Sequence, residues 1–364
     1  MKNNLDDLNF IKKLDKSGCL SSIKYFPDQI ENAWHEVKSL PVENYANISS
    51  VYFCGMGGSA YAGRIIKFLF REKLNVSVDI IDNYTLPRSV NKNSLIFLSS
   101  YSGNTKETLS CLNQALSENL NVVGITSGGK LADSLKSKNK PVFVFDDKLN
   151  PSRQPRLGQG YMLSGTLGIL SKLKFIEISD TNINELVSFL EKESLSLDEK
   201  SPSNSNSAKK LADFFSDKVV NLMAGEFLEG VLHAVRNPLN ETGKHFANYF
   251  VLPESNHHLL EGLRFPNSLA GNSVFVFLKS GFYSQELDRR IEITKDVIGK
   301  NKVKTLDISL KGNSALEQSF ELIQLLAFVS FYLAVLHNVD PAPVPWVDYF
   351  KKSLSADEAE GGLL

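Results

Sequence analysis

Two polar clusters in the second half of the chain contain the residue types that proton transfer needs. The first, Asn237-Pro-Leu-Asn-Glu-Thr-Gly-Lys-His245, places the carboxylate of Glu241 near Lys244, and the second is Pro253-Glu-Ser-Asn-His-His258. A partly desolvated carboxylate with a raised pKa can move a carbon-bound proton, and a histidine can exchange protons near neutral pH. The two clusters therefore indicate acid–base chemistry.

Each cluster also has a simpler interpretation. Glu241 is alternatively a structural carboxylate paired with Lys244. The pair His257-His258 suggests zinc, but adjacent residues rarely present both rings to one metal, and the sequence has no His-x-His or Cys-x-x-Cys to complete a site. We therefore expect neither a metal nor a cofactor. His245 and His258 are expected to be structural.

Two turns rich in glycine and hydroxyl residues lie in the first half, in the segments Val51–Ser59 and Ser94–Thr105. Each follows an apolar run of strand type and precedes a segment with helical periodicity. A helix N-terminus has unpaired backbone N–H groups that favour an anion, and serine and threonine add hydroxyl donors. The residues expected to hold a phosphate are Gly57, Gly58, Ser59, Ser100, Ser102 and Thr105.

The composition of these turns narrows the kind of anion site. Neither turn contains Lys or Arg, so it is not a Walker A loop, and Ala60 stands where a dinucleotide fingerprint needs its third glycine. The simpler alternative is a pair of tight turns with helix caps. Two such turns on successive strands favour an anion site at the carboxyl ends of a sheet. The nearest cations are Arg153 and Arg156, in a turn expected between the domains.

The elements that position these residues alternate between strands and helices. This alternation predicts a parallel sheet with right-handed crossovers, preceded by helical residues 5–40. The expected strands of the first half are 51–54, 76–81, 94–99, 121–125 and 142–145, and its expected helices are 60–70, 105–117 and one that begins with 165–173.

The second half repeats this plan after a charged, serine- and asparagine-rich segment, 191–207, that we expect to be a linker or surface loop. Strand for strand, the repeat predicts two similar α/β domains with doubly wound parallel sheets. The serine-rich turns are missing from the second copy, so one anion site per chain is expected. The expected strands are 219–224, 273–279 and 303–308, and the expected helices are 226–236, 285–298 and 315–337.

Composition excludes several classes of partner. The 364 residues include 40 Lys plus Arg and 41 Asp plus Glu, so a formal charge of -1 gives no global field for nucleic acid or an anionic membrane. The three cysteines, Cys19, Cys54 and Cys111, suit a reducing compartment. No apolar stretch reaches 18 residues, and no signal core begins the chain. We expect a cytoplasmic protein.

The two turns resemble a known family. Gly57-Gly-Ser59 and Ser100-Tyr-Ser-Gly-Asn-Thr-Lys-Glu-Thr108 are similar to the sugar isomerase (SIS) domain, and the match is closest to the bifunctional phosphoglucose/phosphomannose isomerases. The resemblance implies two flavodoxin-like SIS domains. We place them at residues 1–195 and 208–340, with a C-terminal segment at 341–364 that carries a catalytic lysine and a flexible tail from Ser355.

The resemblance also implies roles for single residues. Pro155-Arg156, the Asn-Glu-x-x-Lys and Pro-Glu-x-Asn-His motifs, and the Asp-Pro segment that leads to Lys351 all match the family. It implies that Glu241 is the base, that His257 opens the sugar ring together with Lys351, and that Arg156 stabilises the enediolate. Lys352 remains an alternative to Lys351. In the family the histidine comes from the partner subunit, which implies a homodimer with shared active sites.

The expected function is therefore that of a metal-independent aldose–ketose isomerase that converts glucose 6-phosphate and mannose 6-phosphate to fructose 6-phosphate through a cis-enediol. One alternative is an isomerase of another phosphosugar. A second is a noncatalytic SIS-domain sensor, which would need the phosphate-binding turns but not Glu241, His257 or Lys351. Because the sequence contains both sets of residues, an enzyme is favoured.

Overall fold

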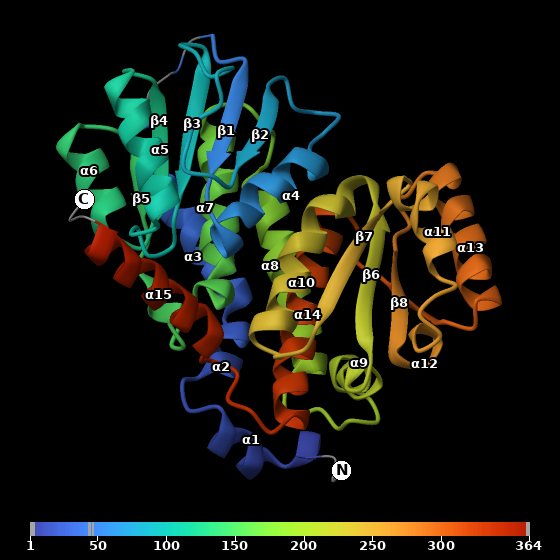
Figure 1. Ribbon diagram of the computed structural model, residues 1–364. Helices are drawn as coiled ribbons and strands as arrows, with labels where there is room; N and C mark the ends of the chain where they lie inside the picture. Colours follow the sequence, from blue (N-terminus) through green and yellow to red (C-terminus); the bar gives the residue numbers. More distant parts are fainter. Residues whose placement is uncertain (1–3, 43–44, 46, 362–364) are drawn as a thin grey trace.

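Two α/β units, each built on a parallel sheet, form the molecule (Figure 1). The computed structural model describes residues 4–42, 45 and 47–361. The first sheet has the strand order β2-β1-β3-β4-β5, and the second has β7-β6-β8-β9. The strands of the first sheet are β1 (Ser50–Cys54), β2 (Ser77–Ile81), β3 (Ser94–Ser99), β4 (Asn121–Thr126) and β5 (Val142–Val144). Those of the second are β6 (Val219–Gly225), β7 (Ala247–Leu252), β8 (Ser273–Lys279) and β9 (Lys304–Ser309).

The second sheet repeats the first with one difference. Strands β7, β6, β8 and β9 take the places of β2, β1, β3 and β4, but among the described residues no strand takes the place of β5. The expected fold class is confirmed, while the strand-for-strand repeat is wrong at this edge. Strand β7 was not expected, although its Tyr-Phe-Val run favours a strand. Its burial is irregular, and Asn248 is exposed.

Helices cover both faces of the first sheet, since alternate residues of a strand point to opposite faces. Tyr52 and Leu98 belong to the core that includes residues of α5 and α6, whereas Phe53 and Phe97 pack into the core on the other face. That second core includes residues of α3, α4 and α7. The helices of this unit are α1 (Leu8–Leu14), α2 (Cys19–Lys24), α3 (Phe26–Val37), α4 (Tyr61–Leu69), α5 (Lys106–Ser117), α6 (Gly129–Ser137) and α7 (Gln159–Lys172). Helix α6 was not expected, and α7 begins six residues before the expected 165–173.

A long apolar helix, α14 (Ala315–Leu336), lies at the centre of the molecule. Its length and composition would suffice to cross a membrane, but 89% of its most apolar window is buried inside the protein. It contacts α8, α9 and α10, so it is a core helix. The remaining helices of the second half are α9 (Ser207–Phe215), α10 (Glu229–Glu241), α11 (Leu259–Gly262), α12 (Leu269–Asn272) and α13 (Gln285–Lys300).

The segment expected to be a linker is largely structured. Helix α8 (Asp180–Leu197) starts with a capping box between Ser179 and Asn182 and continues through the charged residues, because its apolar residues keep a helical period. The loop that follows is fixed by Lys209, whose side chain is 0% exposed. Lys209 Nζ donates to the carbonyl oxygens of Glu199 (2.9 Å) and Ser201 (2.8 Å) and pairs with Asp6 Oδ1 at 2.9 Å.

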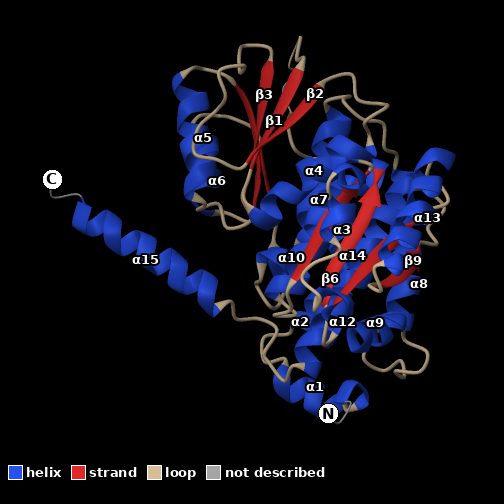
Figure 2. Ribbon diagram, turned by 45° about the vertical axis from the view of Figure 1, so that its right-hand side comes forward, coloured by secondary structure: helices blue, strands red, loops and turns tan. Residues whose placement is uncertain are grey.

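The C-terminal helix α15 (Pro345–Gly361) projects away from the body of the molecule (Figure 2). Trp346 is 80% exposed, and Tyr349 and Phe350 are also exposed. The tail that was expected to be flexible from Ser355 is helical as far as Gly361, and residues 362–364 lie outside the described residues. A helix with three aromatic side chains in solvent is an exposed apolar surface of the kind that other proteins or subunits cover.

The role of Lys209 leads to a stability prediction. Lys209→Met keeps most of the side-chain volume but leaves the carbonyl oxygens of Glu199 and Ser201 without their donor. We expect a loss of about 1–3 kcal/mol in the free energy of unfolding, measured by urea denaturation. Lys192→Met on the exposed face of α8 is the control and should change stability by less than about 0.5 kcal/mol. Equal effects of the two substitutions would contradict the structural role of Lys209.

Candidate active site

The two glycine- and serine-rich turns meet at the carboxyl ends of neighbouring strands. Strands β1 and β3 pair in parallel, with Cys54 opposite Leu98, so the turns that follow them lie side by side. The strand order of the first sheet changes direction between β1 and β3. In open α/β sheets, ligands bind in the crevice outside the carboxyl ends at such a switch point.

Hydrogen bonds tie the two turns together. Tyr101 N donates to Ser59 Oγ (3.0 Å), and Ser99 Oγ donates to Ser59 O (2.7 Å). Ser100 Oγ and Thr105 Oγ1 share a hydrogen bond of 2.8 Å. Ser59 and Ser100 are buried and therefore shape the turns, whereas Gly57 and Ser102 are exposed to solvent.

One glycine is required by the geometry of the second turn. Gly103 has φ +67°, and a Cβ atom there would lie 1.8 Å from Gly128 O. Only glycine fits this position, because the conformation is left-handed and the neighbouring atom is backbone. In the turn after β3, the backbone of Gly103 thus lies close to the backbone of Gly128, and this contact leaves no room for a side chain at position 103.

Arg156 is buried between the two units, with 6% of its surface exposed. It lies in the 3₁₀ turn Pro155–Leu157 at the start of α7. Its guanidinium donates to Thr242 Oγ1 (2.8 Å), Gln154 Oε1 (2.8 Å), Pro341 O (2.9 Å) and Ala342 O (2.7 Å). Segments far apart in sequence are therefore joined by one side chain.

Glu241 ends helix α10 and lies beside Arg156, with Oε2 3.8 Å from Nη1. Partial burial raises the pKa of Glu241 above its usual range, and the charges of Arg156, Lys351, Lys244 and Arg236 act in the opposite direction. The net result is a carboxylate with a raised pKa that lies near four cations. Such a group can both accept and return a proton.

Lys244 and Lys351 complete the charged group around Glu241. Lys244 Nζ donates to Pro341 O (2.8 Å), the same carbonyl that accepts from Arg156. Partial burial and the charge of Arg156 lower the pKa of Lys244 to about 8. Pro341 lies shortly before α15, so these bonds fix the base of the helix that carries Lys351.

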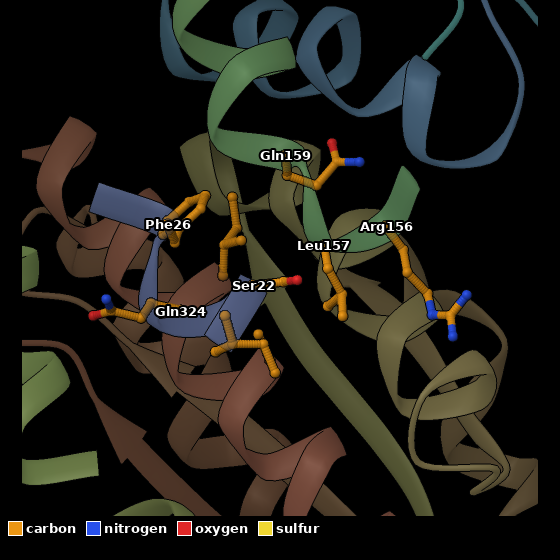
Figure 3. Close-up of a pocket in the computed structure, with 9 residues that line it drawn as sticks. Ser22, Phe26, Arg156, Leu157, Gln159 and Gln324 are labelled. Carbon is orange, nitrogen blue, oxygen red and sulfur yellow. The ribbon is translucent and has the colours of Figure 1, made fainter. Parts of the chain in front are cut away.

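The glycine- and serine-rich turns and the charged group around Glu241 belong to one region. The 3₁₀ turn Gly57–Ala60 contacts both Pro155–Leu157 and α10. A Cβ atom on Gly58 would lie 2.8 Å from Gln159 Nε2, which shows how closely the two turns approach. Figure 3 shows Arg156 in the turn Pro155–Leu157 and Gln159 where α7 begins, two residues after that turn. A cleft of about 360 Å³ lies beside Glu241, lined also by Arg236, Asn237, Asn240 and residues 246–248.

His257 lies apart from this group within the same chain. Asn240, next to Glu241, bonds Ala247 at the amino end of β7, whereas His257 follows the carboxyl end of β7 in the 3₁₀ turn Glu254–His257. The six residues of β7 span roughly 20 Å at about 3.3 Å each. His257 is exposed, so it is free to meet groups of another molecule.

The other histidines have visible structural contacts. His245 Nε2 bonds Lys218 O (2.7 Å), and its ring stacks on His337 at 5.4 Å. His258 Nε2 contacts Glu254 Oε2 at 3.1 Å. Within the described ranges, no three His, Cys, Asp or Glu side chains are grouped so as to hold a metal ion.

Sequence reasoning missed part of the site. Thr242 is fully buried, and its Oγ1 accepts a hydrogen bond from Arg156 Nε. Its position next to Glu241 in the sequence could have indicated that it belongs to the site. No sequence feature predicts that the carbonyl oxygens of Pro341 and Ala342 accept hydrogen bonds from Arg156, because every residue has a carbonyl and only the fold brings these two to the guanidinium. Arg153, the other candidate cation, forms no part of the Arg156 cluster.

Comparison with known proteins places these features in context. Residues 44–140 match the SIS domain family, and residues 204–354 match the family described as the bacterial phospho-glucose isomerase C-terminal SIS domain. A bifunctional phosphoglucose/phosphomannose isomerase of Caldicellulosiruptor bescii is 32% identical over 92% of this chain and 98% of that protein. One from Aquifex aeolicus is 28% identical over 91% and 97%. A hypothetical protein from Thermus thermophilus has the same fold, with a TM-score of 0.73 at 15% identity over 97% of this chain and 94% of that chain.

The charge of Arg156 leads to a prediction about two neighbouring pKa values. Arg156→Gln removes the charge that lowers the pKa of both Glu241 and Lys244, so both pKa values should rise. The measurement is a pH titration by NMR of 13C-labelled glutamate and of 13C-methylated lysine. Arg156→Lys keeps the positive charge and should leave both values nearer those of the wild type. If Arg156→Gln lowers or leaves unchanged either pKa, the electrostatic assignment is wrong.

Proposed function

This chain belongs to the bifunctional phosphoglucose/phosphomannose isomerase family, and from that premise we propose that Glu241 is the base that moves a proton between C1 and C2 of a hexose 6-phosphate. The enzyme is an aldose–ketose isomerase of phosphosugars. The finer proposal is that both glucose 6-phosphate and mannose 6-phosphate are converted to fructose 6-phosphate without a metal ion.

The observation that carries the mechanism is the pairing of Glu241 with Arg156 next to the anion-binding turns. A phosphate held by the turns after β1 and β3 would place the far end of the sugar toward the charged group. Ser102, Gly57 and Gly58 are exposed or partly exposed there, and the buried hydroxyls of Ser59 and Ser100 fix the shape of the turns. This arrangement fits a short, flexible substrate with one phosphate.

In the proposed reaction Glu241 removes the proton from C2 of the open-chain aldose, the double bond between C1 and C2 forms, and the C1 carbonyl oxygen takes up a proton, giving a cis-enediol. Glu241 then returns its proton to C1, and the C2 hydroxyl becomes the carbonyl as it releases a proton, which balances the proton taken up at the C1 oxygen. Arg156 stabilises the negative charge of the enediolate oxygens. C2 is planar in the intermediate, so glucose and mannose phosphates give the same enediol, which is the chemical basis for one site accepting both.

The proposal includes a homodimer in which His257 of one chain serves the Glu241 of its partner. The length of β7 separates the two residues within a chain, and His257 is exposed. Helix α15, which also carries Lys351, exposes Trp346, Tyr349 and Phe350 as an apolar surface. We propose that a second copy covers this surface and supplies the histidine, which together with Lys351 opens the sugar ring.

All three cysteines are free and buried, in keeping with the proposed cytoplasmic location.

The first test is the activity of Glu241→Gln in a coupled assay of fructose 6-phosphate formation, with each substrate in the presence of a chelator. Removing the base should lower kcat by at least about 100-fold while phosphosugar binding persists. In the wild type, kcat/KM should fall as the pH drops through the raised pKa of Glu241, above the ordinary value of about 4.3.

The matched control is Glu254→Gln, which removes an exposed carboxylate beside His258 and should keep most of the activity. Full activity of Glu241→Gln would refute its role as base. If the wild type binds phosphosugars but converts neither substrate, a noncatalytic sensor or a different phosphosugar becomes the better description.

The second test is complementation between two inactive variants, Glu241→Gln and His257→Ala. Each variant alone should be nearly inactive. After the two are unfolded and refolded together in equal amounts, about a quarter of the wild-type activity should return, because half of the dimers are mixed and one of their two sites is intact.

Mixing the folded dimers without exchange provides the control and should give no recovery until subunits exchange. If refolded mixtures remain inactive although mixed dimers are detected by mass spectrometry, His257 acts within its own chain or not at all. Inactive refolded mixtures would overturn the proposal of a shared site, but they would leave the proposed isomerase activity of the wild type intact.

A further inference from the structure

Two consecutive residues after the Arg156 turn lie against both glycine- and serine-rich turns. A Cβ atom on Gly158 would lie 2.3 Å from Cε2 of Tyr101, in the turn after β3. A Cβ atom on Gly58, in the turn after β1, would lie 2.8 Å from Nε2 of Gln159, the first residue of α7. Each turn thus rests on one of these two residues, so the segment that carries Arg156 also sets how far the turns lie from it.

The carboxamide of Gln159 is held in place by burial and by a hydrogen bond. Only 4% of the residue is exposed, and its Nε2 donates to the carbonyl oxygen of Pro155 at 2.8 Å. Pro155 begins the turn that contains Arg156, so this bond ties the side chain to that turn. Gln159 Oε1 has no hydrogen-bond partner among the described residues. A buried acceptor without a partner lowers stability, so packing alone does not account for a glutamine here.

The backbone around Gln159 is fixed by Gln29 of α3. Gln29 is fully buried, and its Nε2 donates to Leu157 O at 3.0 Å. Its Oε1 accepts from Gly160 N at 3.1 Å. The residues on both sides of Gly158 and Gln159 are therefore bonded to α3, and this segment cannot follow a movement of the turns without breaking those bonds.

The distance between the turns and Arg156 matters for the proposed reaction. A phosphate held by the turns fixes one end of the sugar, while Glu241 and Arg156 act at the other end. Because four hydrogen bonds hold the guanidinium, the position of the turn Gly57–Ala60 relative to it decides where C1 and C2 lie. A displacement of about 1 Å between a substrate and its catalytic groups can lower the rate by about 100-fold.

We propose that Gln159 is a positioning residue whose carboxamide sets the separation between the turn Gly57–Ala60 and Arg156. The residue is buried and touches no substrate, and it acts by holding the turn that binds the phosphate. Gly58 is then a glycine because a side chain there would displace the carboxamide. This inference rests on the proposed function, since it takes the phosphate to lie at the turns and the proton transfer to occur at Glu241.

The test is the steady-state kinetics of Gln159→Ala with glucose 6-phosphate and with mannose 6-phosphate. We expect kcat to fall by at least about tenfold, because the sugar is held out of line with Glu241 and Arg156. KM should change by less than about threefold, because the hydrogen bonds that tie the two turns together remain. The acid limb of the pH profile of kcat/KM should not move, because Arg156 keeps its acceptors and its distance from Glu241.

A count of binding sites separates positioning from a loss of folded protein. Equilibrium dialysis with 14C-labelled fructose 6-phosphate measures bound phosphosugar whatever its isomer, and it should give the same number of sites per chain for Gln159→Ala and the wild type. Gln114→Ala is the matched control. This glutamine also bonds backbone groups, those of Tyr84 and Leu86, but it lies near the C-terminal end of α5, so its replacement should leave kcat unchanged.

A second variant alters the same contact from the side of the turn. The φ angle of Gly58 lies outside the left-handed region, so alanine fits its backbone, and the new methyl group pushes away the end of a flexible side chain. Gly58→Ala should lower kcat as Gln159→Ala does. The double variant should be no worse than the poorer single variant, since both changes act through one contact.

Three results would overturn the positioning role. They are an unchanged kcat in Gln159→Ala, a loss of binding sites that accounts for its lower kcat, and losses that multiply in the double variant. The base is tested separately. If Glu241→Gln is inactive while Gln159→Ala is fully active, only the positioning role fails, whereas an active Glu241→Gln refutes the proposed function whatever Gln159 does.

Discussion

The burial of the Arg156 guanidinium is the constraint on which the rest of the site depends. A buried guanidinium needs an acceptor for each of its donors, since an unpaired charge inside a protein is strongly destabilising. Four of its five N–H groups donate to Gln154, Thr242, Pro341 and Ala342. The first lies in the first unit, the second at the end of α10, and the last two before α15. Satisfying one side chain thus fixes the relative positions of three segments.

The same arrangement sets the electrostatics of Glu241. Burial alone would favour the protonated acid, and cations alone would favour a carboxylate with little tendency to accept a proton. Here burial outweighs the opposing effect of Arg156, Lys351 and Lys244, so the pKa rises while the partners remain close. An intermediate balance suits a group that must take and return the same proton.

Within one chain, the length of strand β7 separates Glu241 from His257. The turn Gly57–Ala60, which follows β1, contacts α10, and Asn240 near the end of α10 bonds Ala247 at the amino end of β7. His257 follows the other end of β7. The exposed aromatic residues of α15 lie on the segment that leaves this junction, so the surface that a partner would cover is continuous with the site it would complete.

The sequence by itself determined the local features of this protein. The hydrophobic periods predicted eight of the nine strands found in the described residues. The glycine–serine turns and the cluster around Glu241 were visible as short motifs, because each depends on neighbouring residues. The misses have separate causes. Strand β7 lies between the two polar clusters, the segment after Leu190 stays helical because α8 has an apolar face against the core, and no described strand of the second sheet takes the place of β5. Only the tertiary structure decided that Pro341 and Ala342 receive Arg156, that the pKa of Glu241 rises, and that His257 lies a strand length away. Those facts depend on burial and on contacts between residues up to 186 positions apart, which local sequence does not specify.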